Sequence, residues 1–228
     1  MLTLVVVSIA IQSIAVAQAA NDSLSADRTQ YPAHWWKSVP KDSAASWEVL
    51  PQAAGNGEVI LSKRNELGLL SNFAATPFTY RGKRYASVEG FWQTMLYPED
   101  ASDERAKFPG LQWKYKRDDV ANMTAFEAKS AGDLAEANMK KMGIEWVTFE
   151  GEKFAYHPQA LGKHYKLIVE AMWEKVRQNP AVKKVLLTTG NLVLKPDHIQ
   201  ESNAPPEWKY NEIWMEIREE LQKEETKH

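Results

Sequence analysis

The sequence predicts an α+β fold, in which one helix-rich domain carries a small β-sheet and a hairpin. Apolar residues recur at helical spacing in several long segments, whereas strand signals are few and short. The regular alternation of strand and helix that a doubly wound parallel sheet requires is missing. With 228 residues, of which 44% are apolar and 25% charged, the composition is that of an ordinary globular protein and argues against disorder.

Three short segments carry the strand signals. Residues 58–62, EVILS, predict a strand, and residues 77–87 predict a hairpin that turns at Arg81-Gly82-Lys83. Residues 181–190, AVKKVLLTTG, predict a buried strand that runs into a turn.

Four helices account for the longer periodic segments. The first begins after Ser87, a suitable N-cap, and the second spans residues 124–142 and opens on a capping box. The third spans residues 163–178, and the fourth begins near Tyr210. The apolar stripe of the first helix consists of Val88, Phe91, Trp92 and Met95.

The chain divides into four parts. Residues 1–19 carry no charge and end in a small-x-small pattern, which predicts a signal peptide; an uncleaved membrane anchor is the alternative. Residues 20–57 form a polar leader rich in Pro and Trp, which we expect to be removable without unfolding the rest. Residues 58–222 form the domain, and residues 223–228 a frayed tail. We therefore expect an exported protein, periplasmic or secreted, with no membrane span after signal cleavage.

Composition excludes several functions. The net charge of −2 gives no basic field for nucleic acid, and the absence of cysteine rules out disulfides and thiol nucleophiles. The five histidines form no close pair in the sequence, so a histidine metal site is not expected, and no phosphate-binding loop or dinucleotide motif is present. Some of the nine Trp can line a cleft for a flat ligand.

Glu89 is the main candidate for chemistry. It lies in the first turn of the helix after Ser87, where the partial positive charge favours an ionised carboxylate. It shares a helix face with Trp92 and Gln93, so it can stabilise a developing cation. The alternative is a solvated first-turn glutamate without a functional role.

Other polar residues interrupt apolar or turn segments. Asn72 lies within an apolar run, so it either caps a turn or contacts a ligand. Arg64 and Lys63 can bind phosphate or form a solvated basic pair. Asn191 and Asp197 follow the predicted strand at 181–190, where polar groups often face a site, although Gly190 and Asn191 can equally form a tight turn.

Three motifs resemble the NADAR (YbiA-like) family. Residues 62–95 are similar to its opening motif, in which a basic residue precedes L-S-N-F, a hairpin with a G-K turn and S-x-E-H-x-x-Q. Residues 175–191, KVRQNPAVKKVLLTTGN, resemble K-F-x-Q-N-P followed by L-L-x-T-G-D. Residues 213–221, IWMEIREEL, are similar to the closing L-M-x-x-R-x-x-L helix. The resemblance covers roughly residues 58–222, with the motifs in the family's order.

The resemblance implies a helix-rich α+β domain that hydrolyses N-glycosidic bonds without a metal or cofactor. The substrates implied are small nucleotide-like molecules, such as ADP-ribosylated bases, NAD-related compounds or riboflavin-pathway intermediates. An ionised Glu89 suits stabilisation of an oxocarbenium ion better than general acid catalysis, which needs a raised pKa. The catalytic candidates are Glu89, Asn191 and Asp197. The substrate-binding candidates are Arg64, Asn72, Phe73, Trp92, Gln93 and Lys129.

Two positions depart from the family pattern. The histidine after the motif glutamate is Gly90 here, and the aspartate of T-G-D is Asn191, with Asp197 as a nearby replacement. The departures leave a second hypothesis open, in which the chain is an exported nucleotide- or ADP-ribose-binding module with weakened turnover.

Overall fold

The computed structural model describes residues 28–157 and 161–226. Within these ranges the chain forms six α-helices and three two-stranded sheets, so the predicted α+β class is confirmed. No helix in the described ranges is long and apolar enough to cross a membrane. The helices are α2 (Val88–Thr94), α3 (Arg117–Ala121), α4 (Ala125–Met142), α5 (Lys163–Gln178), α6 (Pro180–Thr188) and α7 (Tyr210–Glu225).

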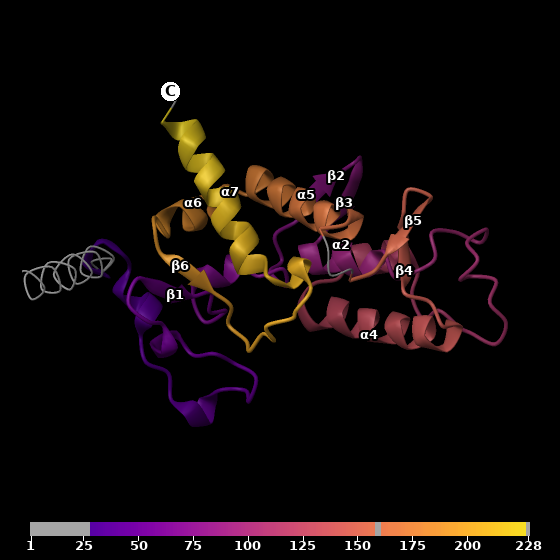
Figure 1. The fold of residues 1–228 in the computed structure, drawn as a ribbon, viewed down its shortest axis with the longest axis horizontal. Coiled ribbons are helices and arrows are strands. Elements are labelled where there is room, and N and C mark those ends of the chain that lie inside the picture. Colours follow the sequence, from indigo (N-terminus) through magenta and orange to yellow (C-terminus); the bar gives the residue numbers. More distant parts are fainter. Residues whose placement is uncertain (1–27, 158–160, 227–228) are drawn as a thin grey trace, which may run out of the picture.

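The three sheets are small and lie at different places around the helices (Figure 1). One is parallel, and it joins segments far apart in the sequence: β1 (Glu58–Ile60) with β6 (Val193–Lys195). The other two are hairpins. They pair β2 (Phe78–Tyr80) with β3 (Lys83–Tyr85), and β4 (Trp146–Phe149) with β5 (Glu152–Ala155).

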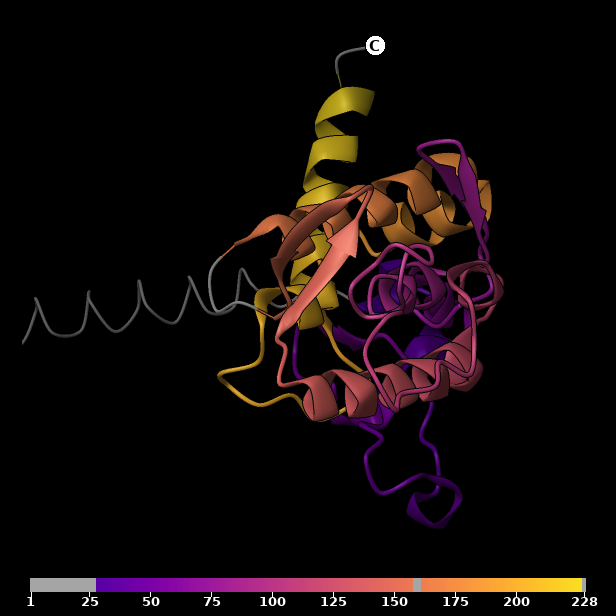
Figure 2. The ribbon, with the colours of Figure 1, turned by 90° about the vertical axis from the view of Figure 1, so that its right-hand side faces the viewer.

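Helix α2 forms the centre of the fold, and every one of its residues is buried. It lies between α4 on one side and α5 on the other, as Figures 1 and 2 both show. Ser87 starts the helix: its Oγ accepts a hydrogen bond of 2.9 Å from the Gly90 N–H and donates to the Met123 carbonyl at 3.0 Å. Any polar side chain on this helix is therefore taken out of water when the chain folds.

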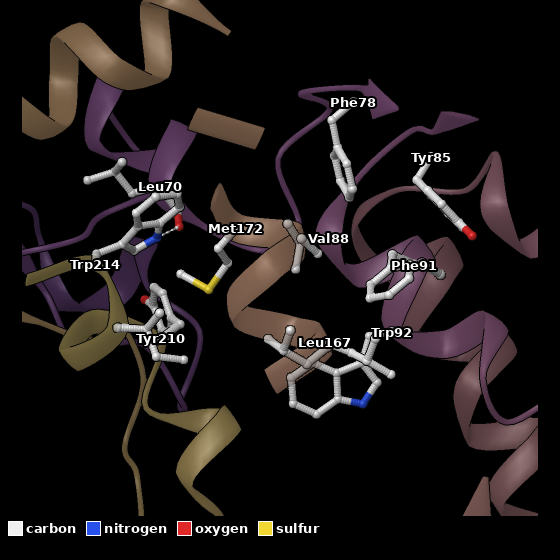
Figure 3. Packing of buried hydrophobic residues seen from close by; sticks show 14 of the residues in the cluster. Leu70, Phe78, Tyr85, Val88, Phe91, Trp92, Leu167, Met172, Tyr210 and Trp214 are labelled. Atoms are coloured by element: carbon white, nitrogen blue, oxygen red, sulfur yellow. Dashed lines mark hydrogen bonds between the residues drawn. The ribbon is translucent and has the colours of Figure 1, made fainter. Parts of the chain in front are cut away.

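Aromatic side chains fill the core around α2. Phe91 packs edge-on against Tyr85, with ring centroids 4.9 Å apart, and Tyr85 stacks on Phe78 (Figure 3). On the other side of the core, the Trp214 indole of α7 donates a 2.6 Å hydrogen bond to the Leu70 carbonyl. Helix α7 is thereby tied to the segment that precedes β2.

The structure confirms the strand at residue 58, the hairpin at residues 77–87 and the four predicted helices. The strand predicted at residues 181–190 is wrong, because residues 180–188 form helix α6. Pro180 suits the first turn of a helix, and the buried residues Val182, Val185 and Leu186 have helical spacing. The predicted capping box is wrong too. Thr124 makes no capping hydrogen bond, and the N–H of Ala125 donates to the Phe73 carbonyl instead.

The leader is part of the packed structure from residue 28 onward. Trp35 is fully buried in the main core, and its indole donates a 2.7 Å hydrogen bond to Glu66. The Val49 N–H donates to the Asp197 carbonyl at 2.8 Å. These contacts argue against the expectation that the leader can be removed without unfolding the rest, which stays a prediction. At the other end of the chain, helix α7 continues to Glu225, so the expected frayed tail is shorter than residues 223–228. The predicted signal peptide, residues 1–19, lies outside the described residues.

Replacing Trp35 with alanine is expected to lower the free energy of unfolding by about 3–5 kcal/mol, because it empties a buried indole site and removes the hydrogen bond from the indole to Glu66, which keeps only its contact with His34. Urea denaturation monitored by circular dichroism measures the change. Trp47→Ala is the matched control, since Trp47 is in the same segment and 43% exposed; a loss below about 1 kcal/mol is expected there. Equal, small losses in both variants would mean that the leader is not part of the core.

Candidate functional site

A cavity of about 470 Å³ opens between α2, α4, the leader and the loop after β6. Its size is within the usual range for small-molecule sites. Eight separate segments of the chain contribute side chains to its wall. The lining residues are Trp47, Lys63, Ser71, Asn72, Phe73, Glu89, Trp92, Gln93, Phe126, Lys129, Glu136, Tyr156, His157, Asp197, His198, Ile199, Trp208 and Tyr210.

Glu89 is a buried carboxyl group on this wall. Only 6% of it is exposed, although it lies in the first turn of α2 as expected. Burial raises the pKa of Glu89 to about 7, and the hydrogen bond from Gln93 and the charge of Lys129 only partly oppose this. The alternative of a solvated glutamate at the helix end is therefore wrong, and the pKa is higher than the expected ionised carboxylate would have. Glu89 can gain or lose a proton near neutral pH.

Gln93 holds the carboxylate of Glu89. Its Nε2 donates a 2.8 Å hydrogen bond to Glu89 Oε1, one helical turn away. The other end of the amide presses against α4 at Gly132, where a Cβ atom would lie only 1.9 Å from Gln93 Oε1. The missing side chain at Gly132 therefore leaves the space in which Gln93 reaches Glu89.

Replacing Gly132 with alanine is expected to displace the Gln93 amide and break its hydrogen bond to Glu89. Because this bond favours the ionised carboxylate, the pKa of Glu89 should rise above its value of about 7. A carbon-13 NMR titration of the glutamate carboxyls measures the shift, with the signal assigned from Glu89→Gln. Ser130→Ala, an exposed position of the same helix, should leave the titration unchanged. An unaltered Glu89 titration in Gly132→Ala would show that Gln93 does not set this pKa.

Gly90, the first departure from the family pattern, is explained by packing. A Cβ atom at this position would lie 2.6 Å from the Met123 carbonyl oxygen and 3.0 Å from that of Val120. Both contacts are with backbone at the end of α3, which cannot rotate away. A histidine at position 90 therefore does not fit this arrangement of α2 and α3.

Aromatic rings form one side of the cavity. Phe126 packs edge-on against Phe73, with centroids 5.3 Å apart, and against Trp47 at 6.3 Å. Phe126 and Trp47 are 60% and 43% exposed, which is unusual for rings of this size. On the α2 side, the indole of Trp92 donates to the Tyr156 hydroxyl at 3.1 Å. A flat ligand therefore has ring faces and edges to pack against.

Asp197 is a second buried carboxyl group that lines the cavity, only 2% exposed. Burial raises its pKa, but hydrogen bonds with His198 and Lys63 outweigh that effect and hold the pKa below its usual range. Lys63 forms an ion pair with Asp197, and its ammonium lies 5.5 Å from the Phe73 ring centroid. The two carboxyl groups of the cavity are thus in contrasting states near neutral pH: Asp197 stays ionised, whereas Glu89 titrates.

Asn72 is fixed by its backbone while one side-chain atom stays free. Its carbonyl accepts a 3.0 Å hydrogen bond from the Glu89 N–H, and the preceding carbonyl, of Ser71, accepts one of 2.7 Å from Lys175. The amide oxygen of Asn72 is buried and finds no hydrogen-bond partner in the part of the chain that the structure describes. Since a buried polar atom normally has a partner, this oxygen is suited to accept a hydrogen bond from a ligand.

The cavity brings together Asn72, Phe73, Trp92, Gln93 and Lys129 with the catalytic candidates Glu89 and Asp197. It does not include two other candidates. Arg64 binds Glu48 through two hydrogen bonds of 2.6 and 2.8 Å, and the carbonyl of Ser43, so it fastens the leader. Asn191 is exposed and lines a separate surface hollow of about 380 Å³ beside α7.

Several lining residues did not stand out in the sequence as site candidates. Trp47 is in the leader, and Phe126, Tyr156 and Trp208 are ordinary aromatic residues whose positions depend on tertiary packing. The sequence places Phe126 at a predicted helix start, but the exposure of its ring, which shows that the core does not need it, is visible only in the structure.

Comparisons with known proteins find similarity in a solved structure but not in family models or curated sequences. No family model matches the chain, and no curated protein matches it. Among solved structures, the NMR structure of the E. coli protein YbiA is similar, with 17% sequence identity and a TM-score of 0.48. The match covers 77% of this chain and 92% of that chain.

Proposed function

We propose that this chain is a hydrolase that cleaves an N-glycosidic bond between a ribosyl group and a nitrogen in a nucleotide-like molecule. The candidates are an ADP-ribosylated base, an NAD-related compound or a riboflavin-pathway intermediate. The observation that carries the proposal is Glu89, a buried carboxyl group with a pKa of about 7 on the wall of an aromatic cavity.

The reaction needs a carboxylate at the sugar. As the bond between the anomeric carbon and the nitrogen breaks, its electron pair goes to the nitrogen and positive charge develops on the sugar. An ionised Glu89, itself buried from solvent, stabilises that charge strongly. Glu89 also accepts a proton from the water whose oxygen bonds to the anomeric carbon. The leaving nitrogen takes up a proton from solvent, and Glu89 then releases its own proton to solvent.

The rest of the cavity suits the two halves of such a substrate. Phe73, Phe126 and Trp47 offer ring surfaces for the base. The unpartnered oxygen of Asn72 can accept a hydrogen bond from a ribose hydroxyl. Lys63 and Lys129 are the ammonium groups of the wall, although each is already paired with an aspartate.

The test is to incubate the purified protein with ADP-ribosylated bases, NAD and ribosylaminopyrimidines, and to detect free base and free sugar by liquid chromatography and mass spectrometry. In ¹⁸O-labelled water the new anomeric oxygen should carry the label. The rate should rise with pH through about 7, as Glu89 ionises.

Three other results separate the alternatives. A rate that falls over the same pH range would make Glu89 a general acid. Tight binding in calorimetry without any product would support a binding module with weakened turnover. Neither binding nor product with any member of the panel would overturn the proposal.

A further inference from the structure

Two histidines and a glutamate from three different segments meet beside the cavity. His157 follows β5, His164 is the second residue of α5, and Glu207 lies in the short 3₁₀ turn Pro206–Trp208. The Nδ1 atoms of His157 and His164 lie 2.9 and 2.8 Å from the same Glu207 oxygen, Oε1. All three donor atoms lie within 4.8 Å of one another.

Hydrogen bonding alone leaves this cluster incompletely satisfied. His164 and Glu207 are both fully buried. Both imidazoles converge on Oε1 of Glu207, whereas Oε2 of Glu207 and Nε2 of His164 are buried and have no hydrogen-bond partner among the described residues. An unpaired oxygen on a buried carboxylate is costly, and a cation among the three groups would satisfy it.

We propose that His157, His164 and Glu207 bind a divalent transition-metal ion, with Zn²⁺ as the best match. Two imidazoles and one carboxylate are the three protein ligands of a known class of zinc sites. Ligand atoms at zinc bond lengths of about 2.0 Å in tetrahedral geometry lie about 3.3 Å apart, so the two separations between nitrogen and oxygen need to widen by only about half an ångström, while no two of the three ligand atoms lie more than 4.8 Å apart. Imidazole nitrogen favours zinc over magnesium or calcium, which take oxygen ligands.

The position of the cluster leaves one side of the ion open. His157 is 20% exposed and lines the cavity, whereas the other two ligands are covered. Trp92 packs against both imidazoles, with centroids 5.6 Å from His157 and 4.9 Å from His164. The fourth coordination position therefore lies on the His157 side, next to the cavity, where water or an anionic group of a ligand can occupy it.

The test is isothermal titration of the untagged, metal-free protein with Zn²⁺, with no substrate present. One ion should bind per chain, the melting temperature should rise with added Zn²⁺, and Mg²⁺ should produce neither effect. Co²⁺ in place of Zn²⁺ should give the visible absorption bands of a tetrahedral site. Because substrate is absent, the outcome is independent of the proposed hydrolase activity.

His157→Ala removes the most exposed ligand and should weaken Zn²⁺ binding by at least about 100-fold with the fold intact. Glu207→Gln should do the same. The matched control is His34→Ala, because His34 also contacts a glutamate, Glu66, at 2.8 Å but lies at the surface in the leader. Absence of binding by the native chain, or binding that survives both His157→Ala and Glu207→Gln, overturns the proposal.

Discussion

Replacing Glu89 with glutamine should slow turnover by roughly 10²-fold or more while substrate binding changes little. Glutamine keeps the shape and can still accept the hydrogen bond from Gln93, but it carries no negative charge. Preorganised charged groups typically contribute about this factor to rate, and they act mainly in the transition state. Single-turnover kinetics and calorimetric binding to the same substrate separate the two quantities.

The same substitution should make the folded protein more stable. The pKa of Glu89 is about 7 in the folded chain against an ordinary value of 4.5, so between these pH values the folded state holds a proton that the unfolded state has released. Stability therefore falls as pH rises from 4.5 to 7. Removing the carboxyl should add about 3 kcal/mol at pH 8 and almost nothing at pH 4.5.

Urea denaturation at pH 5 and pH 8 measures this gain. Glu136→Gln is the control, since Glu136 lines the same cavity but is exposed, and it should change stability little at either pH. If Glu89→Gln turns over substrate at the native rate, Glu89 has no part in the chemistry. If its stability at pH 8 matches that of the native chain, the group is not buried in solution.

Replacing Lys175 with methionine should produce the largest change in the pH dependence of stability. Lys175 is fully buried, and among the described residues its ammonium contacts the Ser71 carbonyl and no carboxylate. Burial lowers its pKa from 10.5 to about 7, so between these values the unfolded chain binds a proton that the folded chain does not. Stability of the native protein therefore rises as pH increases from 7 towards 10.

Lys175→Met removes this proton linkage. Burying the amino group of Lys175 lowers the free energy of unfolding by about 4–5 kcal/mol at pH 7, and the substitution removes this cost. Loss of the hydrogen bond to the Ser71 carbonyl lowers the stability of the variant by about 1–3 kcal/mol. We expect the variant to be about 2–3 kcal/mol more stable at pH 7, with an advantage that disappears near pH 10. Denaturation at pH 7, 8 and 9 tests it, with Lys166→Met, exposed on the same helix, as the control. An unchanged pH slope would show that Lys175 keeps its proton in the folded state.

The variant also tests how Lys175 supports the cavity. Its ammonium holds the Ser71 carbonyl, and the next carbonyl, of Asn72, accepts the N–H of Glu89. A more stable but slower enzyme would identify Lys175 as a positioning residue.

Much of the fold could be predicted because its longer helices have a clear apolar period. Helix α5 was predicted with the bounds that the structure gives it, because Pro180 follows a regular stripe. Helix α6 was predicted as a strand, because a short apolar run with β-branched residues fits either structure. The sequence analysis does not predict the hairpin β4–β5. In the structure Glu150 and Gly151 form its tight turn, and both have positive φ angles.

The site was predictable only where one segment carries the information. The predicted position of Glu89 at a helix start was correct. Its pKa, however, depends on burial against α4, a helix that is distant from Glu89 in the sequence. Arg64 and Asn191 could not be placed relative to the cavity by spacing in the sequence. The proposed metal-binding cluster could not be predicted for the same reason, because Glu207 lies 50 residues from His157 and 43 from His164 in the sequence.

The pairing of β1 with β6 determines when the site can form. Lys63, just after β1, and Asp197, just after β6, lie 134 residues apart in the chain and meet only when both strands pair. A chain leaving the ribosome must therefore expose β1 until almost the whole domain has been synthesised, because contacts between distant segments form late. A chain that stops before residue 193 lacks the parallel sheet and the Asp197 wall, so the nascent protein has no binding cavity during most of its synthesis.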